Sequence, residues 1–470
     1  MGAFFFLYLS KAESVLAILG KRCIIRAHHS KIDMSTDLAQ RALNYHETPR
    51  PGKLEVLPNK SCFTIDDLTL AYSPGVAVPC MEIAADPNKS AAYTGRGNLV
   101  GVISNGTAVL GLGNIGAHAS KPVMEGKGLL FKIYADVDVF DIELDIKKPE
   151  TLIEVIKTME PTFGAINLED IKAPECFIVE QRLREEMNIP VFHDDQHGTA
   201  VISGAALLNA AHLTGRLLQD MKCVVCGAGA AGIACAKFYM ALGIRRDNIF
   251  MFDSKGLIHT GRLDLHPTKA MFAQSEDCTL EVALQGADIF LGLSKKGLLK
   301  PEMLKSMAPN PIIFACANPD PEITYEEAKA ARPDCIMGSG RSDWPNQVNN
   351  VSCFPYMFRA ALDMQATCIN EAMKIAASRA LADLAREEVP AEVVAANGGV
   401  ELQFGRDYVI PKPFDPRMIE YLAPAIAEAA VISGVARRPM PDKEAYKAEL
   451  KARVQKVHER THALVDSYKA

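Results

Sequence analysis

The pattern of apolar and polar positions becomes regular from about residue 198 onward. An apolar, alanine-rich stretch at 199–213 predicts a helix. Short apolar runs then predict strands at 222–226, 249–253, 287–293, 311–317 and 335–338, with helical stretches between most of them. Strands that alternate with helices in this rhythm are typical of a parallel sheet covered on both faces. We therefore expect an α/β fold with a doubly wound parallel sheet in this half of the chain.

The rest of the chain is less regular. Between 34 and about 195, short apolar runs are separated by Gly and Pro turns, and they predict strands at 98–103, 128–134, 163–167 and 190–192 with helices at 151–160 and 173–187. Residues 354–434 read as helical, and 440–470 as a charged helix on the surface. A length of 470 residues fits two or three domains. We expect an N-terminal extension at 1–33, domains at 34–197 and 198–438, and a helical tail at 439–470.

A glycine-rich turn follows the predicted strand 222–226 and reads Gly227-Ala228-Gly229-Ala230-Ala231-Gly232. The first glycine of such a motif permits a tight turn, the second lets the backbone approach a pyrophosphate, and the third lets the following helix pack on the strand. Asp253 ends the next predicted strand, 21 residues after Gly232. An acidic residue about 20 residues on is where a ribose hydroxyl is bound. The pattern predicts a Rossmann-type dinucleotide site, with a plain structural turn as the alternative.

The choice between NAD and NADP stays open at this point. A bare Asp253 favours NAD, because it repels the 2′-phosphate of NADP. Lys255 and Lys269 could offset that charge and hold the phosphate, or they could be solvated surface residues. We favour NADP by a small margin. A second glycine motif at 111–116 is expected to be a close-packed loop, because Pro122 should interrupt any long helix after it and no acidic strand end follows at the required distance.

Carboxylates follow two of the predicted strands. Glu169 and Asp170 come after one strand, and His193, Asp194 and Asp195 come after the other. If the strands are neighbours, these like charges repel unless a proton or cation lies between them. Oxygen ligands suit Mg2+ or Mn2+. Surface acids are an equally good interpretation of the spacing alone.

A zinc site is the less favoured reading of the same segment. His193 and His197 are four residues apart, as in a two-histidine zinc face. The intervening Asp-Asp-Gln and the following Gly198 argue against a regular helix through both histidines, so structural roles are the better interpretation. Zinc through the Cys223–Cys226 pair is also disfavoured, because no second ligand pair follows and both cysteines sit in an apolar run.

Composition excludes several classes of protein. The apolar share is 49%, the charged share 23% and the formal net charge −6, without the basic stripe of a nucleic-acid binder. No run of 18 apolar residues predicts a membrane span. Twelve scattered cysteines suit a reducing compartment, so we expect a cytoplasmic protein. The first 33 residues lack a signal-peptide pattern, and their basic residues only weakly resemble a transit peptide. We expect instead that translation of the native protein begins at Met34.

Motifs in order along the chain resemble those of malic enzymes, in the shorter bacterial branch of that family. The resemblance runs from about 34 to about 438, and it rests on Asp67-Leu68-Thr69-Leu70-Ala71-Tyr72-Ser73-Pro74-Gly75-Val76, Asn105–Gly116, Lys121–Lys127, Leu168-Glu169-Asp170, His193–Ala200, Ala317–Pro321 and Pro345–Val351. Some relatives append a phosphotransacetylase-like domain, which we expect to be absent here. The implied fold is an N-terminal α/β substrate and metal domain, then a Rossmann-type NAD(P)-binding domain with C-terminal helices.

The resemblance implies oxidative decarboxylation of malate to pyruvate and CO2, with reduction of NAD(P) and a divalent metal. It makes Lys127 the base on the malate hydroxyl and Tyr72 the proton donor to enolpyruvate, while Asp194 orients this set. A lysine serves as a base near neutral pH only if burial or a cation lowers its pKa. The remaining implied contacts are the metal ligands Glu169, Asp170 and Asp195, the cofactor contact Thr199, the cofactor or malate contact Asn318 and the substrate contact Asn350.

One departure from the larger relatives weakens the substrate assignments. Those relatives carry an arginine that pairs with a malate carboxylate, and Ala108 stands at the matching place. Residue by residue, Tyr72 could simply pack beside Pro74, and Lys127 could be a surface lysine. The family implies a homodimer or larger oligomer.

Rival functions are a malolactic-type or oxaloacetate-decarboxylating enzyme, a metal-free dehydrogenase and a non-catalytic dinucleotide sensor. A metal-free dehydrogenase does not require Glu169, Asp170 and Asp195 together. A sensor has no need of Tyr72 and Lys127.

Overall fold

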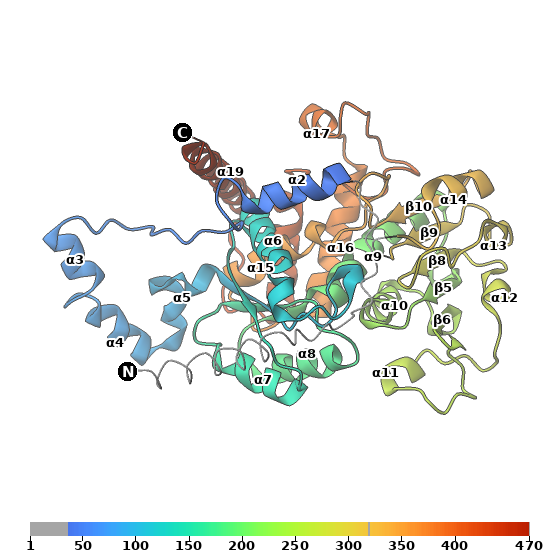
Figure 1. Ribbon diagram of the computed structural model, residues 1–470, viewed down its shortest axis with the longest axis horizontal. Coiled ribbons are helices and arrows are strands. Elements are labelled where there is room, and N and C mark those ends of the chain that lie inside the picture. The colour runs from blue at the N-terminus through green and yellow to red at the C-terminus, as the bar shows by residue number, and fades with distance from the viewer. Residues whose placement is uncertain (1–35, 318–319, 470) are drawn as a thin grey trace, which may run out of the picture. The chain divides into compact units, whose positions relative to one another are not determined.

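The fold is described from a computed structural model in which residues 36–317 and 320–469 are placed (Figure 1). The expected extension at 1–33 and the predicted cofactor residue Asn318 therefore lie outside the described residues. Two parallel sheets organise the described chain, one before and one after residue 194. The α/β fold class predicted from the sequence is confirmed.

The first sheet has the strand order β2-β1-β3-β4, and all its pairings are parallel. Its strands are β1 (Leu99–Ser104), β2 (Asp138–Glu143), β3 (Ala165–Leu168) and β4 (Val191–His193). Alternate residues face opposite sides, as the two-residue period of a strand dictates. Val100 and Val102 share a core cluster with helix α6 (Ala117–Ala135), while Ile166 and Leu168 share one with α7 (Pro149–Thr158) and α8 (Glu175–Glu186).

The strand predicted at 128–134 is wrong, because these residues form the second half of α6. Buried positions in α6 recur every three or four residues, at Met124, Gly128, Phe131 and Ala135. A short apolar run does not distinguish this helical period from a buried strand, which explains the error. The helix also continues through Pro122, contrary to expectation, and Pro122 O accepts a hydrogen bond from Lys53 Nζ.

The second sheet has the order β10-β9-β8-β5-β6-β7 and is parallel except for the short β7. Its strands are β5 (Cys223–Cys226), β6 (Ile249–Asp253), β7 (Gly256–Leu257), β8 (Ile289–Gly292), β9 (Ile312–Ala315) and β10 (Ile336–Ser339). Cys223 and Cys226 are buried in β5, as predicted. One face carries α9 (Asp194–Thr214) and α10 (Ala230–Leu242); the other carries α12 (Leu280–Leu284), α13 (Pro301–Lys305) and α14 (Tyr325–Ala331).

Helix α9 joins the two halves of the described chain. It begins at Asp194 directly after β4, earlier than predicted, and passes through Gly198. No regular helix runs through both His193 and His197, as expected, because His193 ends β4. Gly198 nevertheless lies inside α9, where its lack of a side chain permits close packing: an added Cβ would lie 2.3 Å from Asp194 Oδ1. The helix crosses the predicted domain boundary at 197/198, and the boundary itself stays a prediction. Its buried alanines share one core cluster with residues of both sheets.

Further helices follow the second sheet: α15 (Phe354–Asp363), α16 (Glu371–Arg386), α17 (Ala391–Ala396), α18 (Met418–Ile432) and α19 (Lys443–Ser467). The tail predicted as a charged surface helix is α19, and its side chains Tyr446, Leu450 and Val457 are buried. Short helices near the N-terminus are α2 (Thr36–Glu47), α3 (Ile65–Ala71), α4 (Ala77–Ala85) and α5 (Ser90–Tyr93), and α11 (Pro267–Ala270) follows β7. Among the described residues, no helix is long and apolar enough to cross a membrane.

Candidate active site

Three carboxylates meet where β3 and β4 end. The two strands are parallel neighbours with Leu168 opposite His193, so the residues that follow each strand emerge at the same edge of the sheet. Ligand oxygens of Glu169, Asp170 and Asp195 lie within 4.8 Å of one another. The Asp170 backbone N–H donates to Asp195 Oδ2 at 2.8 Å, which fixes the two segments together. The structure thus brings together the three residues predicted as metal ligands.

The charges of this cluster are not balanced by neighbouring cations alone. Burial and the neighbouring carboxylates raise the pKa of Asp170 to about 9 and that of Asp195 to about 6. Asp170 Oδ2 is buried without a hydrogen-bond partner. An orphaned buried carboxylate oxygen is costly unless a cation or proton meets it. The donor set, all carboxylate oxygen, therefore fits a hard divalent ion of the Mg2+ or Mn2+ kind.

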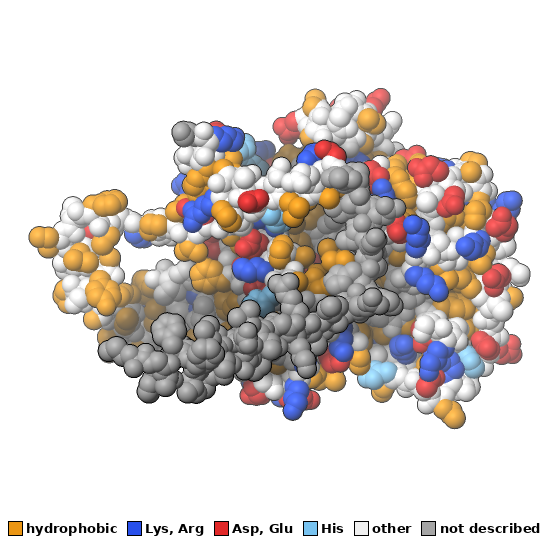
Figure 2. Space-filling model, in the orientation of Figure 1, with side chains coloured by type: hydrophobic (Ala, Val, Ile, Leu, Met, Phe, Trp, Pro, Cys, Tyr) orange, Lys and Arg blue, Asp and Glu red, His pale blue; other side chains and the backbone are white. Residues whose placement is uncertain are grey.

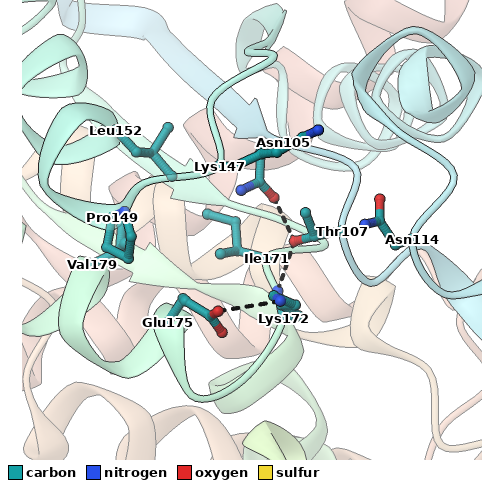
Figure 3. Close-up of a pocket in the computed structure, with 10 residues that line it drawn as sticks. All are labelled: Asn105, Thr107, Asn114, Lys147, Pro149, Leu152, Ile171, Lys172, Glu175 and Val179. Atoms are coloured by element: carbon teal, nitrogen blue, oxygen red, sulfur yellow. Dashed lines mark hydrogen bonds and ion pairs between the residues drawn. The ribbon is translucent and has the colours of Figure 1, made fainter.

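A polar loop at residues 105–108 holds the backbone of Asp170 in place. Figure 3 shows Asn105 and Thr107 of this loop beside Lys172. Thr107 Oγ1 donates to Asn105 Oδ1 and accepts from the Lys172 backbone N–H. The Asp170 carbonyl accepts from the backbone N–H groups of Thr107 and Ala108. The loop borders a cavity of about 100 Å3 that also has Leu152, Val179 and Glu175 in its wall. None of the three clustered carboxylates lines this cavity, so it is separate from the candidate metal site.

Lys127 lies beside the carboxylates and is almost buried, with 9% of its surface exposed. Its Nζ lies 2.6 Å from Asp194 Oδ2 and 2.9 Å from Glu169 Oε1, and 4.2 Å from the centre of the Phe354 ring. Burial acts to lower the pKa of Lys127, in the direction expected for a base. The charges of Asp194 and Glu169 outweigh burial, so the pKa is raised instead.

Asp194 and Asn350 form the inner wall of the site. Asp194 is fully buried at the start of α9, and burial raises its pKa to about 6. Asn350 Nδ2 donates to the Asp194 carbonyl at 3.3 Å, and Asn350 Oδ1 accepts from Thr199 Oγ1 at 3.0 Å. Three residues predicted for catalysis, cofactor and substrate contacts are therefore joined by hydrogen bonds. Asn350 lies in the short helical turn η6 (Asn350–Ser352) that precedes α15.

Gln196 and His197 of α9 belong to a buried hydrogen-bond network with Glu180 and Lys374, two residues that the sequence analysis did not single out. Glu180 Oε1 lies 2.7 Å from His197 Nε2, and Glu180 Oε2 accepts from Gln196 Nε2 at 3.0 Å. Lys374 Nζ lies 3.4 Å from His197 Nδ1. The zinc interpretation gains no support. His197 forms a hydrogen bond with Glu180, and the group of possible metal ligands found in the described residues contains only carboxylates. Glu180 carried no sequence signal, since it sits in an ordinary charged helix.

Tyr72 is the predicted catalytic residue that the structure does not bring to the site. It follows α3 as the residue that caps its C-terminus, and 73% of its surface is exposed. Lys127, by contrast, is enclosed by Asp194, Glu169 and Phe354. Figure 1 shows α3 apart from α6, which carries Lys127.

The predicted dinucleotide turn has the expected geometry between β5 and α10. Gly227 has φ 118°, and a Cβ there would lie 2.3 Å from the Leu293 carbonyl oxygen. A Cβ on Gly232 would lie 1.8 Å from Gly227 O, so helix and turn pack without space for a side chain. Gly229 precedes α10, whose first turn has no side-chain cap, and a Cβ there meets nothing within 4 Å. Open space in front of uncapped N–H groups fits a bound pyrophosphate.

Asp253 ends β6 but is not bare. Arg262 binds it with two hydrogen bonds of 2.9 and 3.0 Å, and Lys269 Nζ lies 2.9 Å from Asp253 Oδ2. Burial acts to raise the pKa of Asp253, but Arg262 and Lys269 outweigh it and lower the pKa. The Nζ of Lys255, a residue predicted beside the cofactor, pairs with Asp264, and the Lys255 N–H donates to Asp253 Oδ1 at 2.9 Å. Arg262 was missed because its nine-residue separation from Asp253 follows no motif used in the sequence analysis.

Two family models match the chain: "Malic enzyme, N-terminal domain" over residues 51–153 and "Malic enzyme, NAD binding domain" over 196–395. A NADP-dependent malic enzyme of Halomonas elongata is 56% identical over 86% of this chain and 96% of its own length. The chain belongs to the malic enzyme family. A crystal structure of malic enzyme from Pyrococcus horikoshii is 38% identical, with a TM-score of 0.84 over 92% of this chain and 99% of that one.

Other malic enzymes resemble the chain as closely but are longer. A NADP-dependent malic enzyme of Haemophilus influenzae is 59% identical over 89% of this chain, and a NAD-dependent malic enzyme of Rhizobium meliloti is 57% identical over 90%. The chain spans about half the length of these two relatives, 56% and 55%. Malic enzymes that use either cofactor are therefore similarly close to this one, and identity alone does not select between them.

Proposed function

We propose that the chain catalyses the oxidative decarboxylation of malate to pyruvate and CO2, with reduction of a nicotinamide cofactor. The observation that carries the proposal is the juxtaposition of Lys127 with Glu169, Asp170 and Asp195 at one sheet edge. A base beside a divalent-ion site is what a 2-hydroxy acid with a carboxylate on C3 needs to lose a proton, a hydride and then that carboxylate as CO2. Membership of the malic enzyme family supports the same reaction.

Glu169, Asp170 and Asp195 are the residues that would hold the metal. When bound, the ion supplies a Lewis acid for the C2 oxygen of the substrate and a counter-charge for the three carboxylates. The nearby side chains are already positioned for this. Asn167 Nδ2 donates to Glu169 Oε2 at 2.9 Å, and the Asp170 N–H donates to Asp195 Oδ2. These contacts orient the ligand oxygens before any ion enters.

Lys127 takes the proton of the C2 hydroxyl in this proposal. A divalent ion held by Glu169, Asp170 and Asp195 would lower the Lys127 pKa that Asp194 and Glu169 raise, which frees the amine to act as a base. The Lys127 Nζ is confined between Asp194 and Glu169, so the amine cannot swing away from the substrate side of the cluster. Asp194 holds the amine in this position and stabilises the positive charge that develops on Lys127 when it takes the proton.

By family resemblance we also assign to Tyr72 the proton that converts the enol of pyruvate to the ketone, although Tyr72 is 73% exposed and lies apart from Lys127 in the described chain. Asn350 and Thr199 bind the malate carboxylate or the cofactor ribose from the inner wall.

We favour NADP over NAD as the cofactor. Gly229 leaves open space for the pyrophosphate at the start of α10, while Gly227 and Gly232 let the turn, strand and helix pack closely. At the ribose end, Arg262 and Lys269 neutralise the Asp253 carboxylate that would otherwise repel a 2′-phosphate. Guanidinium and ammonium groups are also the usual partners of a phosphate.

The proposed reaction is tested by steady-state kinetics. The purified chain with malate and Mn2+ should reduce NADP, seen by absorbance, and form one pyruvate per NADPH. Lys127→Ala should retain NADPH binding but lose turnover by about 100-fold or more, as expected for removal of a general base. Lactate formation without net cofactor reduction would instead identify a malolactic-type enzyme, and unchanged turnover in Lys127→Ala would reject Lys127 as the base.

The cofactor choice is tested at Arg262, with Lys255→Gln as the matched control. Arg262→Gln leaves Asp253 less neutralised, so kcat/KM for NADP should fall by about 10-fold or more while that for NAD holds or rises. Lys255→Gln also removes one positive charge, but the side chain of Lys255 pairs with Asp264. This variant should therefore change the ratio of kcat/KM for NADP to kcat/KM for NAD only a little. An equal loss with both cofactors in Arg262→Gln would contradict the assignment.

A further inference from the structure

Helix α9 begins with two residues of the candidate active site but has no side-chain cap. Asp194 and Asp195 are its first residues, and His193, which precedes them, makes no capping hydrogen bond. Among the described residues, the Asp170 N–H is the one hydrogen-bond donor to the Asp195 carboxylate, whose side chain is 33% exposed. Helix ends without further support fray. The orientation of this first turn therefore depends on contacts made by the residues that follow.

Glu180 of α8 holds the first turn of α9 from outside the helix. Its carboxylate takes the two residues after Asp195, one on each oxygen. Oε2 accepts from Gln196 Nε2 at 3.0 Å, and Oε1 lies 2.7 Å from His197 Nε2. Glu180 is 6% exposed and Gln196 5%, so water does not compete for these hydrogen bonds. A buried polar network of this kind makes its surroundings rigid when its members are satisfied.

The direction of each hydrogen bond follows from the two ends of the network. An ionised carboxylate only accepts, so His197 Nε2 carries the hydrogen that it donates to Glu180. An ammonium only donates, so His197 Nδ1 accepts from Lys374 Nζ, 3.4 Å away. Lys374 belongs to α16, and its Nζ also pairs with Glu371 at 2.7 Å. The network thus ties the start of α9 to α8 on one side and to α16 on the other.

The hydrogen bonds to Glu180 act on residues adjacent to the candidate metal ligand. Successive residues of a helix are about 100° apart around its axis, so a rotation that moves Gln196 moves Asp195 and Asp194 by the same angle. Such a rotation would take Asp194 Oδ2 away from Lys127 Nζ, which lies 2.6 Å from it. It would also turn Asp195 away from the other two carboxylates of the cluster. The direction of both side chains is therefore set where Glu180 holds the turn.

Stability alone is a poor explanation for a carboxylate at this position. Glu180 lies among the buried residues of α8, together with Cys176, Val179 and Leu183. An apolar side chain would fill the same space without the cost of removing a charge from water. Buried ion pairs are often no more stabilising than well-packed apolar residues of similar volume. The orientation that Glu180 imposes on α9 is the better explanation.

We propose that Glu180 is a positioning residue of the active site, which directs the Asp195 and Asp194 side chains through Gln196 and His197. This inference rests on the proposed function, in which Asp195 is a ligand of a divalent ion. Removing a group that orients a metal ligand typically weakens metal binding by about 10–100-fold. Mg2+ demands near-ideal octahedral geometry, whereas Ca2+ accepts flexible arrangements. Loss of the orientation should therefore weaken Mg2+ binding more than Ca2+ binding.

Ion binding to the full chain tests this without turnover. Free Mn2+ is followed by electron paramagnetic resonance, and the Kd values of Mg2+ and Ca2+ are obtained from their displacement of Mn2+. Glu180→Gln should raise the Kd for Mg2+ by about 10-fold or more and that for Ca2+ by a smaller factor. Comparing two ions of equal charge cancels the electrostatic effect of the lost carboxylate, since it acts on both alike. Equal factors, or unchanged Kd values, would overturn the inference.

A second variant and a control complete the experiment. Gln196→Met breaks one of the two hydrogen bonds to Glu180 without changing any charge, so it should also weaken Mg2+ more than Ca2+, and it decides the question if Glu180→Gln does not fold. Unchanged Mg2+ binding in Gln196→Met would count against the proposal. Glu185→Gln removes an exposed carboxylate from the same helix and should bind both ions as wild type does. A loss in this control as large as in Glu180→Gln would overturn the inference.

Failure of this inference is distinguishable from failure of the proposed function. A wild-type chain that binds Mg2+ and oxidises malate, with both variants binding Mg2+ equally well, would lose only the role of Glu180. A wild-type chain that binds no divalent ion would contradict the metal site, and this inference with it. NADPH binding, followed by fluorescence, should be unchanged in Glu180→Gln, because the dinucleotide turn precedes a different helix, α10. A parallel loss of NADPH affinity would indicate general loosening and overturn the positioning role.

Discussion

At the scale of single residues, the site depends on backbone positions that few side chains tolerate. Asp170 has φ 54°, in the left-handed region that costs a non-glycine residue about 1 kcal/mol or more. The carbonyl of Asp170 is held there by Thr107 N and Ala108 N, while its Oδ2 is left without a partner. The surrounding contacts thus offset backbone strain in order to aim a carboxylate at its neighbours.

Two of the three glycines of the dinucleotide turn, Gly229 and Gly232, allow a prediction at the same scale. Gly232→Ala forces a Cβ against Gly227 O and should lower the free energy of unfolding by at least about 1–3 kcal/mol. Gly229→Ala has free space around its Cβ, so its stability should match wild type while NADPH binding weakens by about 10-fold or more. Urea unfolding and fluorescence titration measure the two effects. Equal stabilities, or unchanged NADPH binding in Gly229→Ala, would contradict the prediction.

At the scale of elements, helices α9 and α15 hold the two sheets and the site together. α9 carries Asp194 and Asp195 at its first turn and packs its alanine-rich length against α10 and α16. α15 begins with Phe354, whose ring faces Lys127 Nζ and packs against Phe131 of α6. The site is therefore positioned by helix packing as much as by the strand ends that supply its ligands.

Arg359 of α15 offers a test of this packing. It is 2% exposed, binds Asp363 with two hydrogen bonds of 2.6 and 2.8 Å, and donates to Asn98 Oδ1 beside β1. Arg359→Met leaves Asp363 with less compensation and should cost about 3–5 kcal/mol of unfolding free energy.

An exposed pair on α19 serves as the control for Arg359. Lys447→Met breaks the ion pair with Glu444 and should cost under about 1 kcal/mol. Urea unfolding of both variants gives the difference. A loss in Arg359→Met no larger than that of the control would contradict the role of Arg359.

At the scale of the whole molecule, the carboxylate cluster should couple metal binding to stability. An ion that binds the folded chain alone stabilises it by mass action, by about 2.7 kcal/mol at 100 times its Kd. Mn2+ should therefore raise the thermal midpoint, and EDTA should reverse the rise. Asp195→Asn should lose most of this response, because the ion loses a charged ligand.

Glu175→Gln is the control for the metal prediction, since Glu175 lines the separate cavity rather than the cluster. It should keep the full response to Mn2+. Calorimetry or a thermal-shift assay measures the midpoints. A wild-type midpoint that ignores Mn2+, or an Asp195→Asn chain that still responds fully, would contradict the assignment of the cluster as a metal site.

The alternation of apolar runs with helices was enough to predict the parallel sheet of the second half of the chain, most strands to within a few residues, and the turn at Gly227. The strand β2 was not predicted. The run at 128–134 was misread, because a short and nearly continuous apolar run shows no period that would separate a strand from a helix. The early start of α9 was missed because Gly198 looked unfavourable for a helix until its close contact with Asp194 was known. Glu180 and Arg262 gave no signal, since partners distant in sequence define their roles.

By itself, the sequence determined which residues come after each strand, because strand ends and glycine turns are local consequences of residue type. Only the tertiary structure decided which of those residues meet. Parallel pairing of β3 with β4 joined Glu169 and Asp170 to Asp195, and helix packing enclosed Lys127 beside them. Tertiary structure also separated Tyr72 from that group, because proximity in space depends on long-range packing that no local pattern encodes.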